Sequence, residues 1–318
     1  MVPEAELRPY RSYYDQPVLK PPVWRWPVPT YFFSGGLAGA SATLALVARA
    51  TGRHRLARRA LLTSSAGILV SPALLVEDLG RPERFANMLR VVKPTSAMNL
   101  GAWLLAAMGP AVAGATASEL SGMAPRAGRG LEVVAGALGP ALATYTAVLT
   151  SDTAVPAWHE AGRRLPFVFA SGAAASAGAA GALLTPGNEA EPARRLALLG
   201  AVCELAATAT MQHGLDRDAG PEVANAYRTG RAARLSRWST ALTGSGAALL
   251  AVGRRRPVSR LAGAAAVLAG AAVQRFAVME AGAGSALDPM ATVGPQRRRV
   301  AAGRACQPDA TSTRSWPA

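Results

Sequence analysis

Residues that can donate, accept or hold a proton gather at the ends of long apolar stretches of this 318-residue chain. Each group combines acids with an arginine or a histidine. The groups are Glu77 with Asp78 and Arg81, Asp152 with His159 and Glu160, His213 with Asp216, and Arg275 with Glu280 and Asp288. His159 is the best candidate proton donor, because an imidazole titrates near neutral pH. The alternative is a surface histidine that contacts a partner.

Glu204 differs from these groups because it lies near the middle of an apolar stretch. An ionised carboxylate at that depth is costly, so Glu204 should be protonated or paired. We predict a residue of a proton path, and the alternative is a neutral packing carboxyl held by hydrogen bonds. Arg275 could snorkel to the interface or pair with an acid such as Glu280 or Asp78.

The elements that must position these groups are eight apolar stretches. The chain is 50% hydrophobic and 17% charged, and Glu132, Glu204 and Arg275 are the acidic or basic residues inside the stretches. A soluble helix of this length would carry a charged stripe facing water. The sequence therefore predicts an all-α membrane protein with about eight transmembrane helices. The stretches are 28–47, 60–76, 98–117, 131–149, 167–184, 196–211, 238–252 and 261–279.

These stretches are rich in alanine and glycine, which lets membrane helices approach closely. Gly35, Gly36 and Gly39 lie inside the first stretch with no strand before them and no Lys-Ser/Thr after them. Close helix packing explains them better than a nucleotide-binding loop.

Eight spans place both chain ends on one side of the membrane, here named side A. Side A holds residues 1–27, 77–97, 150–166, 212–237 and 280–318, and therefore the four polar groups apart from Arg275, which lies in the last stretch near side A. Side B holds residues 48–59, 118–130, 185–195 and 253–260, in which arginine makes up a larger share of the residues than on side A. By the positive-inside rule, side B should be cytoplasmic, with the termini outside the cytoplasmic membrane. The net charge of +15 is spread over span ends, which argues against nucleic acid.

We divide the chain into an extramembrane segment (1–27), a transmembrane domain (28–281), a loop (282–295) and a disordered basic tail (296–318). Cys203 and Cys306 are too few and too far apart for a disulfide or an iron–sulfur site. Three histidines are too few to ligate two haems, so a subunit without haem or metal is expected.

Several strings occur together in an informative order. They are WPVPTY at 26–31, EDLGRPERF at 77–85, KPTSAMN at 93–99, SDTAVPAWHE at 151–160, and Arg275-Phe276 followed by Asp288-Pro289. Taken together they resemble the polysulfide reductase NrfD-like family, and the resemblance runs from about Tyr14 to Arg299.

The resemblance implies a non-catalytic, haem-free membrane subunit of a molybdopterin oxidoreductase complex, folded as two four-helix bundles. Such a subunit binds quinone or menaquinone as a substrate and exchanges electrons with an iron–sulfur, ferredoxin-like partner. That partner serves a molybdopterin catalytic subunit of the formate dehydrogenase or polysulfide reductase type.

The resemblance also suggests Tyr145 as a quinone ligand, with an interfacial anchoring tyrosine as the alternative. We expect the quinone site on side A, between Tyr145, Asp152, His159 and the turn from Asp78 to Arg81. Asp78 and Arg81 could instead form a structural ion pair.

Two other functions stay open at this point. A proton-coupled membrane transporter would also use Glu204 and Arg275. A passive membrane anchor would need no quinone.

Overall fold

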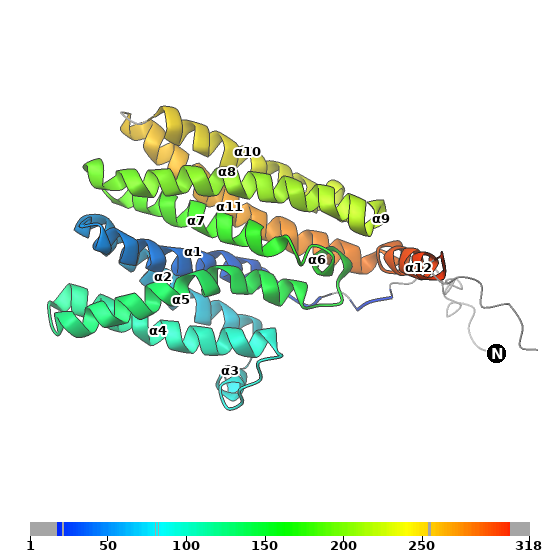
Figure 1. Ribbon diagram of the computed structural model, residues 1–318, viewed down its shortest axis with the longest axis horizontal. Coiled ribbons are helices and arrows are strands. Elements are labelled where there is room, and N and C mark those ends of the chain that lie inside the picture. Colours follow the sequence, from blue (N-terminus) through cyan, green and yellow to red (C-terminus); the bar gives the residue numbers. More distant parts are fainter. Residues whose placement is uncertain (1–17, 21, 80, 82, 254–255, 306–318) are drawn as a thin grey trace, which may run out of the picture.

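The computed structural model describes residues 18–20, 22–79, 81, 83–253 and 256–305, and this part of the chain is helical with no strand. Its eight longest helices lie side by side along the molecule (Figure 1). They are α1 (Pro27–Ala50), α2 (His54–Leu79), α4 (Ala97–Ser121), α5 (Pro125–Ser151), α7 (Leu165–Leu184), α8 (Glu191–Gly214), α10 (Gly230–Val252) and α11 (Pro257–Leu287). Shorter elements lie between them: α3 (Glu83–Met88), α6 (Pro156–His159), η3 (Gly187–Ala190), η4 (Leu215–Ala219) and α9 (Pro221–Arg228). A further helix, α12 (Pro289–Ala305), follows α11.

The long helices form two bundles. In the first bundle, α1 packs against α2 and α5, and α4 packs against both α2 and α5. In the second bundle, α7 packs against α8 and α11, and α10 against α11 and α8. Contacts of α1 and α5 with α7 join the two bundles. The expected all-α architecture is confirmed.

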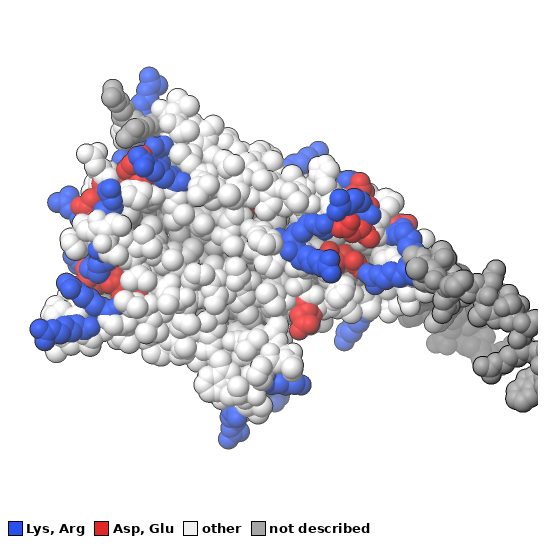
Figure 2. Space-filling model, in the orientation of Figure 1, with Lys and Arg blue, Asp and Glu red and all other residues white. Residues whose placement is uncertain are grey.

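Six of the described helices are long and apolar enough to cross a membrane: α1, α2, α4, α5, α7 and α11. A broad face without charge separates the two charged ends of the molecule (Figure 2). The helices α8 and α10 are of similar length but more polar, because α8 carries Glu204 and α10 has three arginines among its first eight residues. Their crossing of the membrane, and hence the count of eight spans, stays a prediction.

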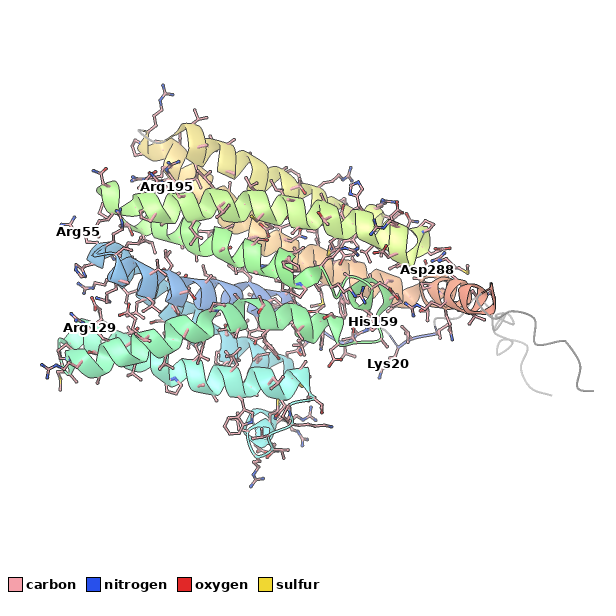
Figure 3. All side chains as sticks on the ribbon, viewed as in Figure 1. Lys20, Arg55, Arg129, His159, Arg195 and Asp288 are labelled. Atoms are coloured by element: carbon pink, nitrogen blue, oxygen red, sulfur yellow. The ribbon has the colours of Figure 1, made fainter. Side chains whose placement is uncertain are left out.

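The two ends of the bundle match the expected sides of the membrane. Arg55, Arg129 and Arg195 lie at the end named side B, whereas His159 and Asp288 lie toward the opposite end (Figure 3). The short helices α6, α9 and α12 also lie at the side A end (Figure 1). Which end faces the cytoplasm stays a prediction.

The C-terminal region differs from the expectation. The helix α11 continues to Leu287 and α12 follows at once, so the expected loop at 282–295 is largely helical, and the expected disordered tail is helical up to Ala305. Proline is well suited to begin α12 at Pro289. Ion pairs hold α12 against the bundle, because Arg298 binds Glu222 at 2.9 Å and Arg299 binds Glu160. The expected tail beyond residue 305 and the N-terminal segment before residue 18 lie outside the described residues.

Glycine brings the helices of the first bundle into backbone contact. A Cβ atom on Gly39 of α1 would lie 2.5 Å from the carbonyl oxygen of Gly139 on α5, closer than carbon and oxygen approach. Gly39 therefore serves close helix packing, as the sequence predicts.

Candidate functional site

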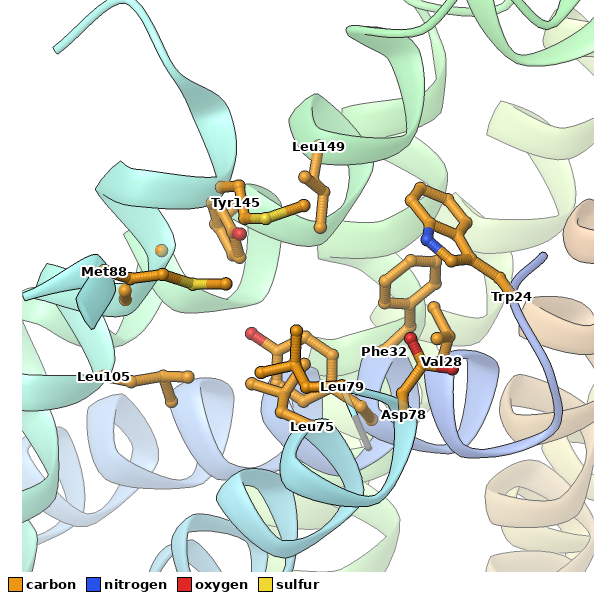
Figure 4. A pocket seen from close by; sticks show the side chains of 14 residues that line it. Trp24, Val28, Phe32, Leu75, Asp78, Leu79, Met88, Leu105, Tyr145 and Leu149 are labelled. Carbon is orange, nitrogen blue, oxygen red and sulfur yellow. The ribbon is translucent and has the colours of Figure 1, made fainter. Parts of the chain in front are cut away.

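A pocket opens at the side A end of the first bundle, where α1, α2, α4 and α5 meet (Figure 4). Its open volume is about 70 Å³, so it is a narrow slot rather than a chamber. Apolar and aromatic side chains make up most of its wall. The lining residues are Trp24, Val28, Tyr31, Phe32, Leu75, Asp78, Leu79, Met88, Met98, Gly101, Ala102, Leu105, Tyr145 and Leu149.

Two tyrosines supply phenol groups to this pocket. Tyr31 belongs to the second turn of α1 and is 1% exposed, and Tyr145 belongs to the last two turns of α5. Neither phenol makes a hydrogen bond to another described residue. A buried phenol usually finds a partner, so both O–H groups are available to a ligand.

The ring of Tyr145 is fixed by a glycine on the opposite helix. A Cβ atom at Gly101 of α4 would overlap the phenol ring of Tyr145. The ring therefore packs directly on the backbone of α4, and any larger residue at position 101 would displace it.

Asp78 is the charged residue among those lining the pocket. It lies in the last turn of α2, and its carboxylate interacts with the backbone N–H and the side chain of Arg25. Arg81 is exposed, and no ion pair joins it to Asp78 among the described residues. The structure therefore gives Asp78 a different partner from the one considered in the sequence, because the chain before α1 passes the end of α2.

Asp152 and His159 are exposed and do not line the pocket. The string that contains them supports the pocket instead through Trp158. The Trp158 indole is fully buried, donates from Nε1 to the carbonyl oxygen of Val278 at 2.7 Å, and stacks on Trp24 at 5.2 Å between ring centroids. Trp24 in turn lines the pocket. Of the five predicted quinone ligands, the structure brings together Tyr145 and Asp78.

The sequence interpretation missed Tyr31, Trp24 and Gly101. Tyr31 ends one of the strings that carried the family resemblance, so a signal for it was present. Gly101 could not be found from the sequence, because its role depends on a ring from a helix more than forty residues away.

Glu204 lies outside this pocket, in the second bundle. Its carboxylate Oε1 is 3.8 Å from Nη1 of Arg275, and both side chains are almost fully buried. Arg275 also donates from Nη2 to the carbonyl oxygen of Phe169 at 2.9 Å, and its guanidinium lies 4.1 Å from the centroid of the Phe169 ring. Both carboxylate oxygens of Glu204 lack hydrogen-bond partners. Its role in a proton path stays a prediction.

Of the two alternatives for Arg275, the structure shows pairing with an acid, but that acid is Glu204 and neither Glu280 nor Asp78. Glu280, one turn further along α11, faces Arg231 at 3.5 Å instead. Gly172 of α7 leaves the space in which Arg275 meets Glu204, since a Cβ atom there would lie 2.9 Å from Arg275 Nη2. The sequence alone does not tell which neighbouring helix a side chain faces, because the rotation of a helix about its axis depends on how the helices pack.

Within the described residues, no group of three or more His, Cys, Asp or Glu side chains could hold a metal ion. Cys203 is exposed and unpaired there, and Cys306 lies outside them.

Comparison with known proteins agrees with this architecture. Residues 16–284 match the family model described as polysulphide reductase, NrfD. No curated protein sequence matches the chain. The family consists of membrane subunits of molybdopterin oxidoreductase complexes. The match covers most of the sequence, so this multi-pass membrane chain belongs to the NrfD polysulphide reductase family.

Proposed function

We propose that the chain binds a quinone headgroup in the pocket of the first bundle and exchanges electrons between membrane quinone and a partner subunit. The observation that carries this proposal is the pair of available phenols, Tyr31 and Tyr145, which face one narrow apolar pocket.

The pocket supplies what quinone chemistry needs. A quinone has a flat apolar ring and two carbonyl oxygens that accept hydrogen bonds, and its reduction takes up two electrons and two protons. Trp24 and Phe32 offer aromatic walls, and the two phenols offer donors. Asp78, at the rim with Arg25, is a carboxylate that can exchange protons with the pocket.

The electron partner would bind at side A, close to the pocket. The family membership supports an iron–sulfur, ferredoxin-like subunit next to a molybdopterin catalytic subunit, of the formate dehydrogenase or polysulfide reductase type. The surface formed by α6, α9 and α12 is the docking face in this proposal, with menaquinone as one candidate quinone. We place the chain in the cytoplasmic membrane, with side A outside.

His159, Asp152 and Arg81 lie at the side A surface rather than in the pocket. We propose that they act there, by exchanging protons with water or by contacting the partner, rather than by touching quinone. Their exposure supports this role.

The experiment is purification in mild detergent from the native host, followed by metal analysis, a haem spectrum and quinone extraction on one sample. Molybdenum or tungsten together with iron, bound quinone and no haem b is the expected result. A metal-free, quinone-free protein that purifies alone would contradict the proposal and favour a transporter. Metals without quinone would instead favour a passive anchor.

A further inference from the structure

An apolar groove lies at the junction of the two bundles, where α1 and α5 meet α7 and α8. Its open volume is about 420 Å³, within the range of about 300–1,000 Å³ that is typical of ligand pockets. Its wall includes Ala40 and Val47 of α1, Pro140 of α5, Ala174 of α7 and Leu196 of α8. No residue of this wall lines the pocket of the two tyrosines, so the groove is a separate site.

The chemistry of the groove wall favours an apolar occupant. The wall contains two hydroxyl groups, and both already donate to backbone carbonyl oxygens. Thr43 Oγ1 donates to Gly136 and Thr144 Oγ1 to Pro140, each at 2.9 Å. The other wall residues are alanine, leucine, valine and proline. Val47 is 53% exposed and Pro140 is also exposed, so the groove opens on the outer surface of the helices, where lipid lies.

The groove runs along the helices towards side B. On α1 its wall extends from Ala40 to Val47, a rise of about 10 Å, and the helix ends at Ala50. On α8 the wall includes Pro192, in the first turn of that helix at the same end of the molecule. A hydrocarbon chain whose headgroup lies at side B would follow this direction.

An arginine lies at the side B end of the groove. Arg195 is three residues after Pro192, so the two side chains share one face of α8 (Figure 3). Its side chain is 74% exposed and donates from Nε to Glu191 at 3.0 Å, which leaves its terminal amino groups at the surface. Arg194 binds the same carboxylate but also donates to a backbone carbonyl of α10. Two guanidinium groups on one carboxylate leave a positive charge at this end of the groove.

We propose that the groove holds one acyl chain of an anionic phospholipid of the phosphatidylglycerol type, whose single phosphate binds Arg195. A guanidinium binds phosphate through charge-assisted hydrogen bonds, and basic sites between membrane helices suit anionic headgroups. One exposed arginine matches one phosphate. The bound chain contacts helices of both bundles and therefore stabilises their junction. The inference does not rest on the proposed quinone site.

The test uses the complex purified in mild detergent with its partner subunits and washed until loosely held lipid is removed. Lipid extraction followed by mass spectrometry identifies and counts the phospholipid retained per chain. Native mass spectrometry of the delipidated complex, with phosphatidylglycerol or phosphatidylcholine added back, gives the affinity for each.

The informative variants are Arg195→Gln, which removes the phosphate ligand, and Ala174→Leu, which fills the groove. Arg55→Gln is the control for the first, because Arg55 is also 74% exposed at side B and faces Glu189 at 3.8 Å, but belongs to α2, which contributes no residue to the groove wall. Ala206→Leu is the control for the second, because Ala206 is exposed on α8 outside the groove.

We expect the wild-type complex to retain phosphatidylglycerol and both informative variants to bind it about tenfold or more weakly, with the controls unchanged. A washed wild-type complex without phospholipid, or one that binds phosphatidylcholine as tightly, would overturn the inference. Informative variants that bind lipid as well as their controls would also overturn it.

Two other results would replace the proposed occupant. Loss of quinone rather than phospholipid from Ala174→Leu would overturn the inference and assign the groove to the isoprenoid tail of the quinone. Cardiolipin retained in place of phosphatidylglycerol would overturn the assignment of a single phosphate to Arg195.

Discussion

The two bundles each contain a buried carboxylate facing an arginine, and the two pairs differ in their access to water. The side chains of Arg49 and Glu132 in the first bundle are 19% and 5% exposed, and Glu119 beside them is 26% exposed. Arg275 and Glu204 in the second bundle are 2% and 3% exposed. The first pair is partly open to the side B surface, whereas the second is enclosed by protein. The same two kinds of side chain are therefore partly solvated in one bundle and desolvated in the other.

The surroundings of the pairs differ in the same direction. The first bundle has a pocket with two phenols and, between α1 and α2, a buried hydrogen bond of 2.9 Å from Ser34 to Ser71. Close backbone contacts occur in the second bundle as well, because a Cβ atom on Gly246 of α10 would lie 2.8 Å from the carbonyl oxygen of Gly263 on α11. We infer that the proposed quinone chemistry belongs to the first bundle, because the two phenols face one pocket there.

The largest effect is expected from Glu204→Leu. Removing one partner of a buried ion pair leaves an uncompensated charge and costs about 3–5 kcal/mol. The thermal unfolding temperature of the purified complex should fall strongly. The double variant Glu204→Leu/Arg275→Met should recover much of this loss, because an apolar pair replaces the ionic one.

The same pair of variants tests the alternative role of Glu204. If Glu204 carries protons, the double variant will be stable yet lose quinol turnover. A Glu204→Leu variant as stable as the wild type would contradict a stabilising role of the ion pair.

The next largest effect is expected at Gly101, on which the Tyr145 ring packs. Gly101→Ala places a methyl group where the Tyr145 ring lies, so the ring must move and quinol affinity should fall about tenfold or more, equivalent to about 1.4 kcal/mol. Gly109→Ala on the same helix is the control, because the nearest atom to its Cβ, on Ile68, is at 4.0 Å. Equal quinol KM values for both variants would show that the pocket is not the quinone site.

A smaller effect should follow from Tyr145→Phe, which removes one hydroxyl and keeps the ring. One hydrogen bond contributes about 0.5–1.5 kcal/mol, so the quinol KM should rise up to about tenfold. His159→Ala should leave the KM unchanged, because His159 is exposed outside the pocket. A rise in KM for His159→Ala, with none for Tyr145→Phe, would move the site to the membrane surface.

The smallest effect is expected at the side A end of the second bundle. Asp218 accepts a hydrogen bond from Arg164 at 2.6 Å, which lowers the pKa of its carboxyl, with a further contribution from Arg217. A lowered pKa stabilises the fold above the unfolded value near 4 and loses that contribution as pH falls through the folded value.

Asp218→Asn should therefore unfold at a slightly lower temperature than the wild type at pH 7, and the difference should shrink as the pH is lowered below the unfolded value near 4. A difference that persists at the lower pH would indicate an effect other than charge.

Composition and spacing predicted the fold class, because charge is confined to the ends of apolar stretches wherever lipid surrounds a helix. The family resemblance suggested Tyr145, and together with the polar groups of side A it predicted Tyr145 and Asp78 as neighbours at one end of the bundle. Composition and spacing did not predict that Arg275 faces Glu204 or that Tyr31 shares the pocket, because the rotation of a helix is set by packing against others.

The most direct measurement is photoaffinity labelling of the intact complex with an azidoquinone, followed by peptide mapping with and without excess menadione as competitor. The expected labels fall on the pocket residues of α1, α4 and α5, around Tyr31, Gly101 and Tyr145, and the competitor removes them. Labels confined to the second bundle, or pocket labels that the competitor does not reduce, would contradict a quinone site between the two tyrosines.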